Sequence, residues 1–327
     1  MAEPWSPFHL RLHRLLLHRP QLLPQQATLL LAVSGGQDSM ALVGLLRDLQ
    51  RLHHWTLQLW HGDHGWRQES ADQAAELRHW ADQQGLALQV ERWRTPQPGE
   101  AAARDWRYQC LRAAAAAIGA SHVVTGHTAS DRAETLLLQL ARGSHRQGLA
   151  SLRPLRPLAE GITLARPLLL FSRAETARIQ ELLALPLWPD PSNQDQRFSR
   201  NRIRAEVLPV LEQLHPGAAR RLSGLAERLA AEQDGQDELL QLALGQLRHT
   251  TGDGLPGLQR RPLMALHPGN QRRLLRAWLG QQGVINVSAS QLETLLAQLA
   301  PERGPGSQQL QGGRQLQWDR TDLWLLG

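Results

Sequence analysis

Short apolar runs alternate with helical stretches over the first half of the chain, and this alternation constrains the fold most. The run Ala27–Val33 has the composition of a buried strand and is followed at once by a tight loop and a helical stretch. The same alternation continues with strands and helices expected in turn at 55–60, 69–84, 87–92, 100–118, 122–125 and 131–141. Strands that alternate with helices pair in parallel, since each helix crosses over the sheet. The pattern predicts an α/β fold, an open parallel sheet with helices on both faces.

A second domain is expected after residue 215, because the sequence pattern changes there. The chain has 327 residues, enough for two domains of ~150 residues each. Beyond Leu211 it is rich in Leu, Ala, Gln and Arg with helical periodicity, and strand-like runs return only at the end, where Gln308–Leu310 and Leu316–Leu326 predict a hairpin. We therefore expect domains over 1–215, opening with an amphipathic helix that begins at residue 8 and ends near Pro20, and over 216–327, the latter mainly helical.

The absence of lysine excludes several kinds of site. The 36 cationic side chains are all arginine, set against 30 acidic ones. A Schiff-base lysine, a pyridoxal-phosphate anchor and a Walker-type phosphate loop are therefore excluded. Guanidinium groups match phosphate geometry, so the net charge of +6 is compatible with a nucleic-acid partner. Biased codon usage explains an all-arginine composition at least as well.

Cysteine content and hydropathy bear on the cellular compartment. Cys110 is the only cysteine, which excludes an internal disulfide and a cysteine-rich zinc or iron–sulfur site. The apolar run at 15–17 is bracketed by His and Arg, and it is much shorter than a signal-peptide core or the ~20 residues that cross a bilayer. We expect a cytoplasmic protein without a membrane partner.

The loop after the first strand carries the most specific motif. It precedes a helix, where unpaired backbone N–H groups and the helix dipole favour an anion. The glycines let the backbone approach a ligand closely, whereas the carboxylate of Asp38 would repel a phosphate unless a metal ion bridges the two. A bare Ser-Gly-Gly is commonly just a connection, but the full hexapeptide resembles the pyrophosphate loop of the ATP pyrophosphatase superfamily, whose members split ATP between its α and β phosphates. The loop consists of Ser34, Gly35, Gly36, Gln37, Asp38 and Ser39.

Four further segments narrow this resemblance to one family. They are His61–Arg67 (HGDHGWR), Glu100–Tyr108 (EAAARDWRY), Thr125–Thr135 (TGHTASDRAET), and Asp190–Asn193 (DPSN) ahead of Arg200–Arg204 (RNRIR). Together they resemble the tRNA(Ile)-lysidine synthetase family, closely over residues 25–215 and in general character over the remainder. Thr128 stands where a second histidine is frequent in the family and Trp66 where leucine is usual, so position 128 is given no role in proton transfer.

The resemblance implies an ATP-dependent ligase that forms a carbon–nitrogen bond. Such an enzyme adenylates C2 of the wobble cytidine in the CAU anticodon of tRNA(Ile) and then couples free L-lysine. The products are lysidine, AMP and pyrophosphate, and codon specificity changes from AUG to AUA. The implied partners are tRNA(Ile), lysine, ATP as substrate and Mg²⁺ held by Asp38. The first domain would then bind ATP and the second would bind tRNA, while the oligomeric state stays open, with a homodimer as one alternative.

The resemblance also implies which side chains form the site. The loop from Ser34 to Ser39 would bind ATP. The residues expected to act in catalysis are Asp38, Arg104, His127 and Asp131. The residues expected to contact the base, lysine or tRNA are Asp63, His64, Arg67, Arg107, Arg200, Asn201, Arg202 and Arg204.

Each motif also has an interpretation from the residues alone. Arg104, Arg107 and Tyr108 are spaced to share one helix face with Glu100, which suits a phosphate contact but also suits solvent. Asp131 with Glu134 three residues on would also form a helix-capping box. Arginine clusters suit contacts to the tRNA backbone, although surface solubility explains them as well. Beyond 200–204, such arginines are Arg142, Arg146, Arg153 and Arg156, and, in the second domain, Arg220, Arg221, Arg260, Arg261, Arg272 and Arg273.

Two other functions remain as alternatives. A tRNA thiolase of the same superfamily would adenylate a base but deliver sulfur, usually through paired cysteines that this chain lacks. A non-catalytic RNA-binding protein could retain a degenerate nucleotide loop, but the intact Asp38 and Ser39 argue against this.

Overall fold

The computed structural model describes residues 5–65, 69–97, 99–188, 199–251 and 254–326. The chain divides into two compact units, Met1–Ala230 and Ala231–Gly327. This division falls within the long helix α10 (Ala218–Leu247), whereas the predicted boundary near residue 215 lies just before that helix. Within the described ranges, no helix is both long enough and apolar enough to cross a bilayer.

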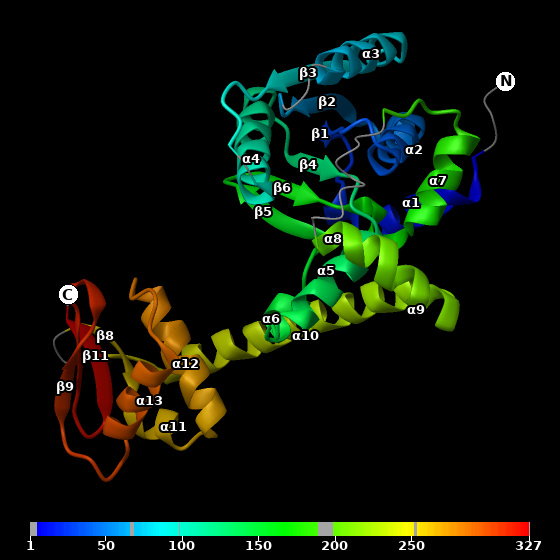
Figure 1. Cartoon of the computed structure of the whole chain (residues 1–327). Helices are drawn as coiled ribbons and strands as arrows, with labels where there is room; N and C mark the ends of the chain where they lie inside the picture. The colour runs from blue at the N-terminus through cyan, green and yellow to red at the C-terminus, as the bar shows by residue number, and fades with distance from the viewer. Residues whose placement is uncertain (1–4, 66–68, 98, 189–198, 252–253, 327) are drawn as a thin grey trace. The chain divides into compact units, whose positions relative to one another are not determined.

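A six-stranded sheet forms the centre of the first unit (Figure 1). Its strands are β1 (Thr28–Ala32), β2 (Thr56–Asp63), β3 (Ala87–Arg92), β4 (His122–Thr125), β5 (Leu155–Ala159) and β6 (Ile162–Ala165). The order across the sheet is β3-β2-β1-β4-β6-β5, and the pairs are parallel except that the edge strand β5 runs antiparallel to β6. The predicted α/β fold with an open, largely parallel sheet is confirmed, and the strands expected at 87–92 and 122–125 coincide with β3 and β4.

Helices cover both faces of this sheet. Residues of α1, α2, α3 and α7 pack on one face and residues of α4 on the other. The helices of this unit that precede α10 are α1 (Pro7–His18), α2 (Gln37–His53), α3 (Glu69–Gln83), α4 (Glu100–Ala117), α5 (Ala129–Ala141), α6 (Arg146–Leu149), α7 (Arg173–Leu182), α8 (Ser199–Arg202) and α9 (Leu208–Leu214), with short 3₁₀ segments at Pro20–Leu22 and Pro167–Leu170 and a π-helical turn at Ile203–Val207. The leading helix ends at His18, consistent with its predicted end near Pro20; a proline there has no N–H to continue the helix.

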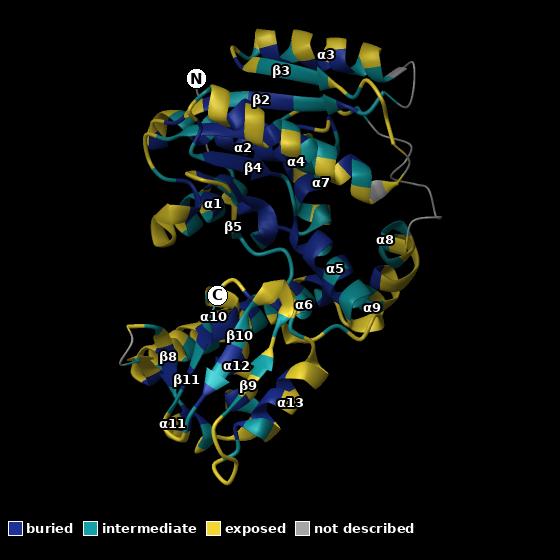
Figure 2. Ribbon diagram, turned by 90° about the vertical axis from the view of Figure 1, so that its left-hand side faces the viewer, coloured by how far each residue is buried: buried dark blue, intermediate teal, exposed yellow. Residues whose placement is uncertain are grey.

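The leucines of β1 show why this strand is apolar without interruption. Leu29 and Leu31 pack in a core with residues of α1, α2, α3 and α7, whereas Leu30 packs in a second core with Trp60 and residues of α4. A strand buried on both faces needs apolar side chains at every position. Figure 2 shows the central strands as buried and much of α3 as exposed.

The hairpin of β5 and β6 was not expected from the sequence. Pro157 lies in β5, and a proline, which cannot donate a ladder hydrogen bond, weakens the sequence signal for a strand. It is tolerated here because β5 is the edge strand, and Gly161 makes the turn with a φ of +68°.

The second unit combines helices with an antiparallel sheet. Its helices, besides the end of α10, are α11 (Arg260–Met264), α12 (Pro268–Gln281) and α13 (Ala289–Gln298). The strands, β7 (Arg248–Thr250), β8 (Pro256–Gln259), β9 (Gly306–Gln309), β10 (Gln315–Trp318) and β11 (Asp322–Leu326), are ordered β7-β8-β11-β10-β9. The expected C-terminal hairpin is present, but the expectation of no earlier strands is wrong. β8 contains Pro256 and Gly257, which favour a turn in sequence, yet glycine is required there because a Cβ would lie 2.5 Å from the Leu323 carbonyl oxygen.

Arg260 is buried, which contradicts its expected contact with RNA phosphate. Its side chain is 2% exposed. The guanidinium donates to the carbonyl oxygens of Leu299 at 2.9 Å, Ala300 at 2.8 Å and Arg303 at 2.8 Å, and also to that of Asp319. This side chain therefore ties α11 to the end of α13 and to the β10–β11 turn.

Arg260→Ala should destabilise the second unit by about 3 kcal/mol, because buried carbonyl groups would lose a charged donor. Urea unfolding followed by circular dichroism measures the change. The neighbouring Arg261 is exposed, so Arg261→Ala is the matched control and should change stability by no more than about 0.5 kcal/mol. Equal effects of the two substitutions would contradict the structural role of Arg260.

Candidate active site

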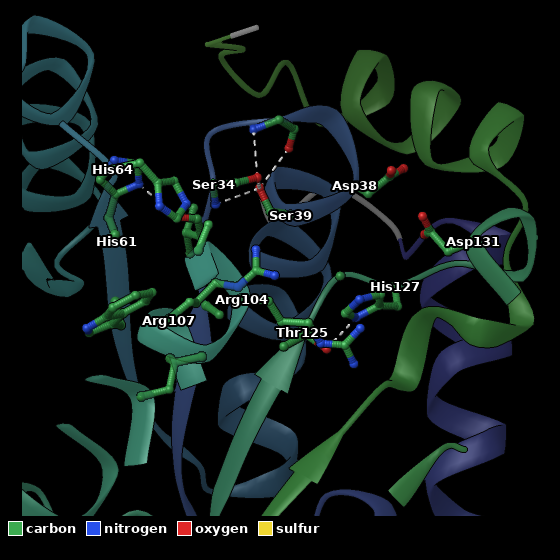
Figure 3. Close-up of a pocket in the computed structure, with 18 of the residues that line it drawn as sticks. Ser34, Asp38, Ser39, His61, His64, Arg104, Arg107, Thr125, His127 and Asp131 are labelled. Atoms are coloured by element: carbon green, nitrogen blue, oxygen red, sulfur yellow. Dashed lines mark hydrogen bonds between the residues drawn. The ribbon is translucent and has the colours of Figure 1, made fainter. Parts of the chain in front are cut away.

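The carboxyl ends of β1, β2 and β4 open onto one cavity of about 450 Å³ (Figure 3). The order of strands reverses between β1 and β4, and open α/β sheets bind ligands at such a reversal. Loops from these strand ends line the cavity together with α4, the start of α7, and the segment around α8. The predicted motifs thus meet at one edge of the sheet, as their positions after strands implied.

The loop between β1 and α2 presents an open helix N-terminus. The N-cap of α2, Gly36, makes no side-chain capping hydrogen bond, which leaves the first N–H groups available. Ser39 holds the loop closed, since its hydroxyl accepts from the Ser34 N–H at 3.2 Å and donates to the Gly36 carbonyl oxygen at 2.8 Å. Gly35 has a φ of +80°, a conformation that favours glycine. This geometry suits a bound phosphate.

Trp188, which sequence reasoning did not single out, packs on the same loop. Its N–H donates to the Gly35 carbonyl oxygen at 2.9 Å, and its indole N–H donates to Glu76 at 2.6 Å. A Cβ at position 35 would lie 3.1 Å from the Trp188 Cβ. Trp188 therefore fixes the outer side of the loop.

Asp38 is held by two residues of α7 that the sequence did not reveal. Arg173 donates to its carboxylate at 2.9 Å, and the Thr176 hydroxyl also donates to it. Burial raises the pKa of Asp38, and the nearby charge of Asp131 raises it further, against the opposing effects of Arg173 and Thr176. The only available signal for these partners was the Ser172–Glu175 capping box that begins α7.

The loop after β4 lies against the start of α2. A Cβ on Gly126 would lie 2.9 Å from the Asp38 carbonyl oxygen, so glycine alone allows this approach. The next residue, His127, lines the cavity, and its Nδ1 is 2.8 Å from the Thr125 hydroxyl. Burial lowers the pKa of His127, which keeps the imidazole neutral at neutral pH.

Helix α5 starts earlier than predicted, and its capping box is a different one. Thr128 is the N-cap, and the Asp131 carboxylate accepts from the Thr128 N–H at 2.7 Å and hydroxyl at 2.8 Å. The sequence suggested Asp131 as the cap and Glu134 as its partner, and this interpretation is wrong. The observed capping box gives the threonine at position 128 a structural role, since its side chain caps the helix.

Asp131 and Glu134 instead bind two arginines from the segment around α8. Arg200 donates to Asp131 at 2.9 Å and to Glu134 at 2.8 Å. Arg204 donates to Glu134 at 2.7 Å and lies 3.4 Å from Asp131. Burial by itself would raise the pKa of Asp131, but Arg200, His127, the Thr128 N–H and Arg204 outweigh it and lower the pKa. Asp131 is thus kept ionised, and the two carboxylates anchor the basic motif at the cavity.

The α4 motif supplies arginines to another side of the cavity. Arg104, Arg107 and Tyr108 line it, as their helical spacing predicted. The side chain of Glu100 lies outside the described residues. Arg104 is exposed and donates no hydrogen bond to any described residue, so it is available to a ligand.

The motif after β2 contributes a carboxylate that shapes its own turn and histidines that line the cavity. Asp63 is buried and accepts from the Gly65 N–H at 2.8 Å, which shapes the turn, while His64 lines the cavity. His61, absent from the predicted site, also lines it. Its Nδ1 donates to the Val33 carbonyl oxygen at 2.8 Å, and burial lowers its pKa.

Some predicted residues fall elsewhere. Arg202 is exposed and pairs with Glu206 at 3.0 Å, and it does not line the cavity, although Asn201 does. Arg67, Trp66 and the Asp190–Asn193 motif lie outside the described residues. The other predicted site residues are brought together.

Comparison with known proteins identifies the family. The model of the PP-loop domain matches residues 8–211, and that of the TilS substrate binding domain matches residues 258–324. The tRNA(Ile)-lysidine synthase of Parasynechococcus marenigrum is 57% identical, covering 99% of this chain and 96% of its own. The chain belongs to the tRNA(Ile)-lysidine synthase family.

Two further relatives named tRNA(Ile)-lysidine synthase also match this chain over nearly its whole length. The Synechococcus sp. (strain ATCC 27144) protein is 49% identical over 94% of this chain and 93% of its own, and that of Prochlorococcus marinus (strain SARG) is 42% identical over 100% and 98%. Among solved structures, the U34-tRNA thiolase NcsA from Methanococcus maripaludis, with its [4Fe-4S] cluster, has a TM-score of 0.58 at 18% identity, covering 68% of this chain and 78% of that one. This likeness shows a shared fold.

Asp38→Asn should reduce AMP formation from ATP, tRNA and lysine by at least about a hundredfold, because the carboxylate expected to hold Mg²⁺ beside the phosphates is lost. The fold should persist. Burial raises the pKa of Asp38, so its charged form costs stability above that pKa, and the neutral amide should leave the melting temperature equal or higher at neutral pH. Asp105→Asn, on the exposed surface of α4, is the control. Near-normal turnover of Asp38→Asn would contradict a role at the phosphates.

Proposed function

We propose that this protein attaches L-lysine to C2 of the wobble cytidine in the CAU anticodon of tRNA(Ile), with ATP cleaved to AMP and pyrophosphate. The observation that carries the proposal is the single cavity where an open phosphate loop, Arg104 and Arg107 of α4, and the anchored Arg200 and Arg204 meet. Membership of the tRNA(Ile)-lysidine synthase family over nearly the whole chain supports the same function.

The first step would be adenylation of the base. The cytidine O2 attacks the α-phosphate, the bond to the β-phosphate breaks, and pyrophosphate leaves. The N–H groups at the start of α2, the dipole of that helix and the Ser34 hydroxyl would stabilise the charge that develops on pyrophosphate. Arg104, whose side chain forms no hydrogen bond or ion pair with a described residue, would contact the phosphate that becomes AMP.

The residues present fit a magnesium ion carried by ATP. Mg²⁺ usually binds one or two carboxylates together with substrate phosphates. Asp131 accepts four hydrogen bonds, from the Thr128 N–H and hydroxyl and from Arg200 and Arg204, whereas Asp38 accepts three, from Arg173, Thr176 and, at 3.5 Å, Gln37, and so retains a lone pair. Asp38 would therefore hold the ion, which would neutralise phosphate charge.

The second step would join lysine to the activated base. The ε-amine attacks C2, a proton leaves the nitrogen, and the bond from C2 to the adenylate oxygen breaks to release AMP. Asp131 is a poor proton acceptor at neutral pH, because its pKa is lowered and its oxygens already accept from Thr128, Arg200 and Arg204. Neutral His127 lies beside it and would orient the base as a hydrogen-bonding group.

A thiolase function is the second candidate, because a U34-tRNA thiolase shares the fold. The chain has a single cysteine, Cys110. Burial raises the pKa of its thiol to about 12, and the thiol also faces Glu91. One protonated, half-buried thiol suits neither a cysteine-ligated cluster nor a persulfide carrier.

The second unit would contribute to tRNA binding, in keeping with the match of residues 258–324 to the substrate binding domain. Exposed arginines such as Arg261, Arg272 and Arg273 remain candidates for phosphate contacts.

The direct test incubates the protein with ATP, labelled lysine and a panel of tRNA transcripts. Label should enter only the isoleucine tRNA with a CAU anticodon, together with AMP and pyrophosphate. Label in other tRNAs, or in none, would contradict the proposal, and sulfur incorporation from a sulfide donor would favour the thiolase.

Arg104→Ala should reduce turnover by roughly tenfold to a thousandfold, because a charge-assisted phosphate contact is lost. The melting temperature should not change, since Arg104 donates to no described residue. Arg104→Lys should restore only part of the rate, because lysine lacks the guanidinium fork. Steady-state kinetics with tRNA and ATP varied in turn provide the measurement. Full rescue by lysine would contradict a bidentate contact.

A further inference from the structure

Four arginine side chains gather around the ring of Tyr108. The guanidinium carbons of Arg156, Arg104 and Arg107 lie 5.0, 5.6 and 5.9 Å from the ring centroid. The fourth, Arg166, interacts with the Tyr108 hydroxyl. Two of the four come from α4, one from β5 and one from the end of β6, so separate elements build this cluster, which we call the Tyr108 arginine cluster.

Arg166 forms the buried base of the cluster. It is 3% exposed and donates to the Arg153 carbonyl oxygen at 2.7 Å, while its Nε is buried without a hydrogen-bond partner among the described residues. Burial lowers the pKa of Arg166, and the charges of Arg156 and Arg104 lower it further. These cations therefore repel one another.

Arg104 and Arg156 have no described carboxylate beside them that would offset this repulsion. In the described parts of the chain, neither Arg104 nor Arg156 forms a hydrogen bond or an ion pair. The face of the Tyr108 ring attracts them through cation–π contacts, but this attraction is weaker than that of an anion. A polyvalent group such as phosphate would relieve the repulsion and match the guanidinium geometry.

The position of the cluster separates it from the nucleotide phosphate loop. Arg104, Arg107 and Tyr108 line the cavity, and Figure 3 shows the two arginines on the same side of it. Arg156 and Arg166 do not line it, and Arg156 is exposed on the edge strand β5. The cluster therefore runs from the cavity to the outer surface. The backbone of an RNA strand would follow the same path if only the reacting base entered the cavity.

We propose that Arg156, together with Arg104 and Arg107 over Tyr108, binds a phosphodiester of the RNA next to the nucleotide whose base reacts. This inference rests on the proposed function for the identity of the RNA. Arg156 would be a positioning residue, because it holds the backbone and does not reach the reacting atoms.

The test measures binding of the full chain to an anticodon stem-loop RNA with a CAU anticodon over a range of salt concentrations, without ATP or lysine. Arg156→Ala should weaken binding by about tenfold, and the slope of log affinity against log salt should become shallower by about 0.7, the value for one phosphate contact on a single strand. Arg156→Lys should keep most of the slope. Arg51→Ala, exposed at the end of α2, is the matched control and should bind as the wild type does.

Neutral methylphosphonate linkages, placed one at a time along the loop of the RNA, then locate the contact. One linkage beside the target cytidine should weaken binding to the wild type by more than it weakens binding to Arg156→Ala, because the variant has already lost part of the same contact. Wild-type affinity and slope in Arg156→Ala would overturn the proposal. Loss of ATP binding instead of RNA binding would also overturn it and assign the cluster to nucleotide phosphate.

Two controls separate this result from other failures. Melting temperatures show whether Arg156→Ala is folded, and Arg156→Gln provides a second neutral variant if it is not. The RNA-binding comparison needs no turnover, so failure of the wild type to form lysidine would count against the proposed function alone.

Discussion

The pairing of β1 with both β2 and β4 is the constraint on which the site depends. Because the strand order reverses at β1, the loops after β1 and β4 leave a crevice between them. Gly126 then allows the second loop to lie against the backbone of Asp38, where any Cβ would clash. The phosphate loop, His127 and the start of α5 consequently occupy fixed positions around one cavity, and the α4 arginines complete it.

An all-arginine set of cations divides into groups with distinct physical roles. Arg132 and Arg260 are buried and donate to backbone carbonyl groups, so they hold elements together. Arg173, Arg200 and Arg204 neutralise carboxylates beside the cavity, which fixes their own positions in turn. Arg104 and Arg156 of the Tyr108 arginine cluster, whose side chains form no hydrogen bond or ion pair with a described residue, remain for ligands. The positive net charge therefore does not by itself identify a nucleic-acid surface, because the neighbours of each guanidinium decide whether it can bind a ligand.

Local signals carried most of what the sequence could predict. The buried strand with the β1 leucines, the tight loop and helix that follow it, and the helical spacing of Arg104 with Arg107 each depend on neighbours within a few residues, and these structural predictions are confirmed. The Asp38–Arg173 pair joins residues 135 positions apart, and no periodicity encodes it. The role of Glu134 was missed for the same reason, because its partners are Arg200 and Arg204. The strand β8 was not predicted because Pro256 and Gly257 favour a turn in sequence. Glycine is required there by the close approach of Leu323 in the neighbouring strand β11.

The central claim is that the base of the tRNA, and not lysine, receives the adenylate at the loop between β1 and α2. Exchange of labelled pyrophosphate into ATP tests this most directly, because it reports reversible adenylation before any lysine is joined. We predict exchange with tRNA(Ile) bearing a CAU anticodon in the absence of lysine, and its loss in Asp38→Asn. Exchange that requires lysine, or that proceeds with lysine and no tRNA, would contradict the claim.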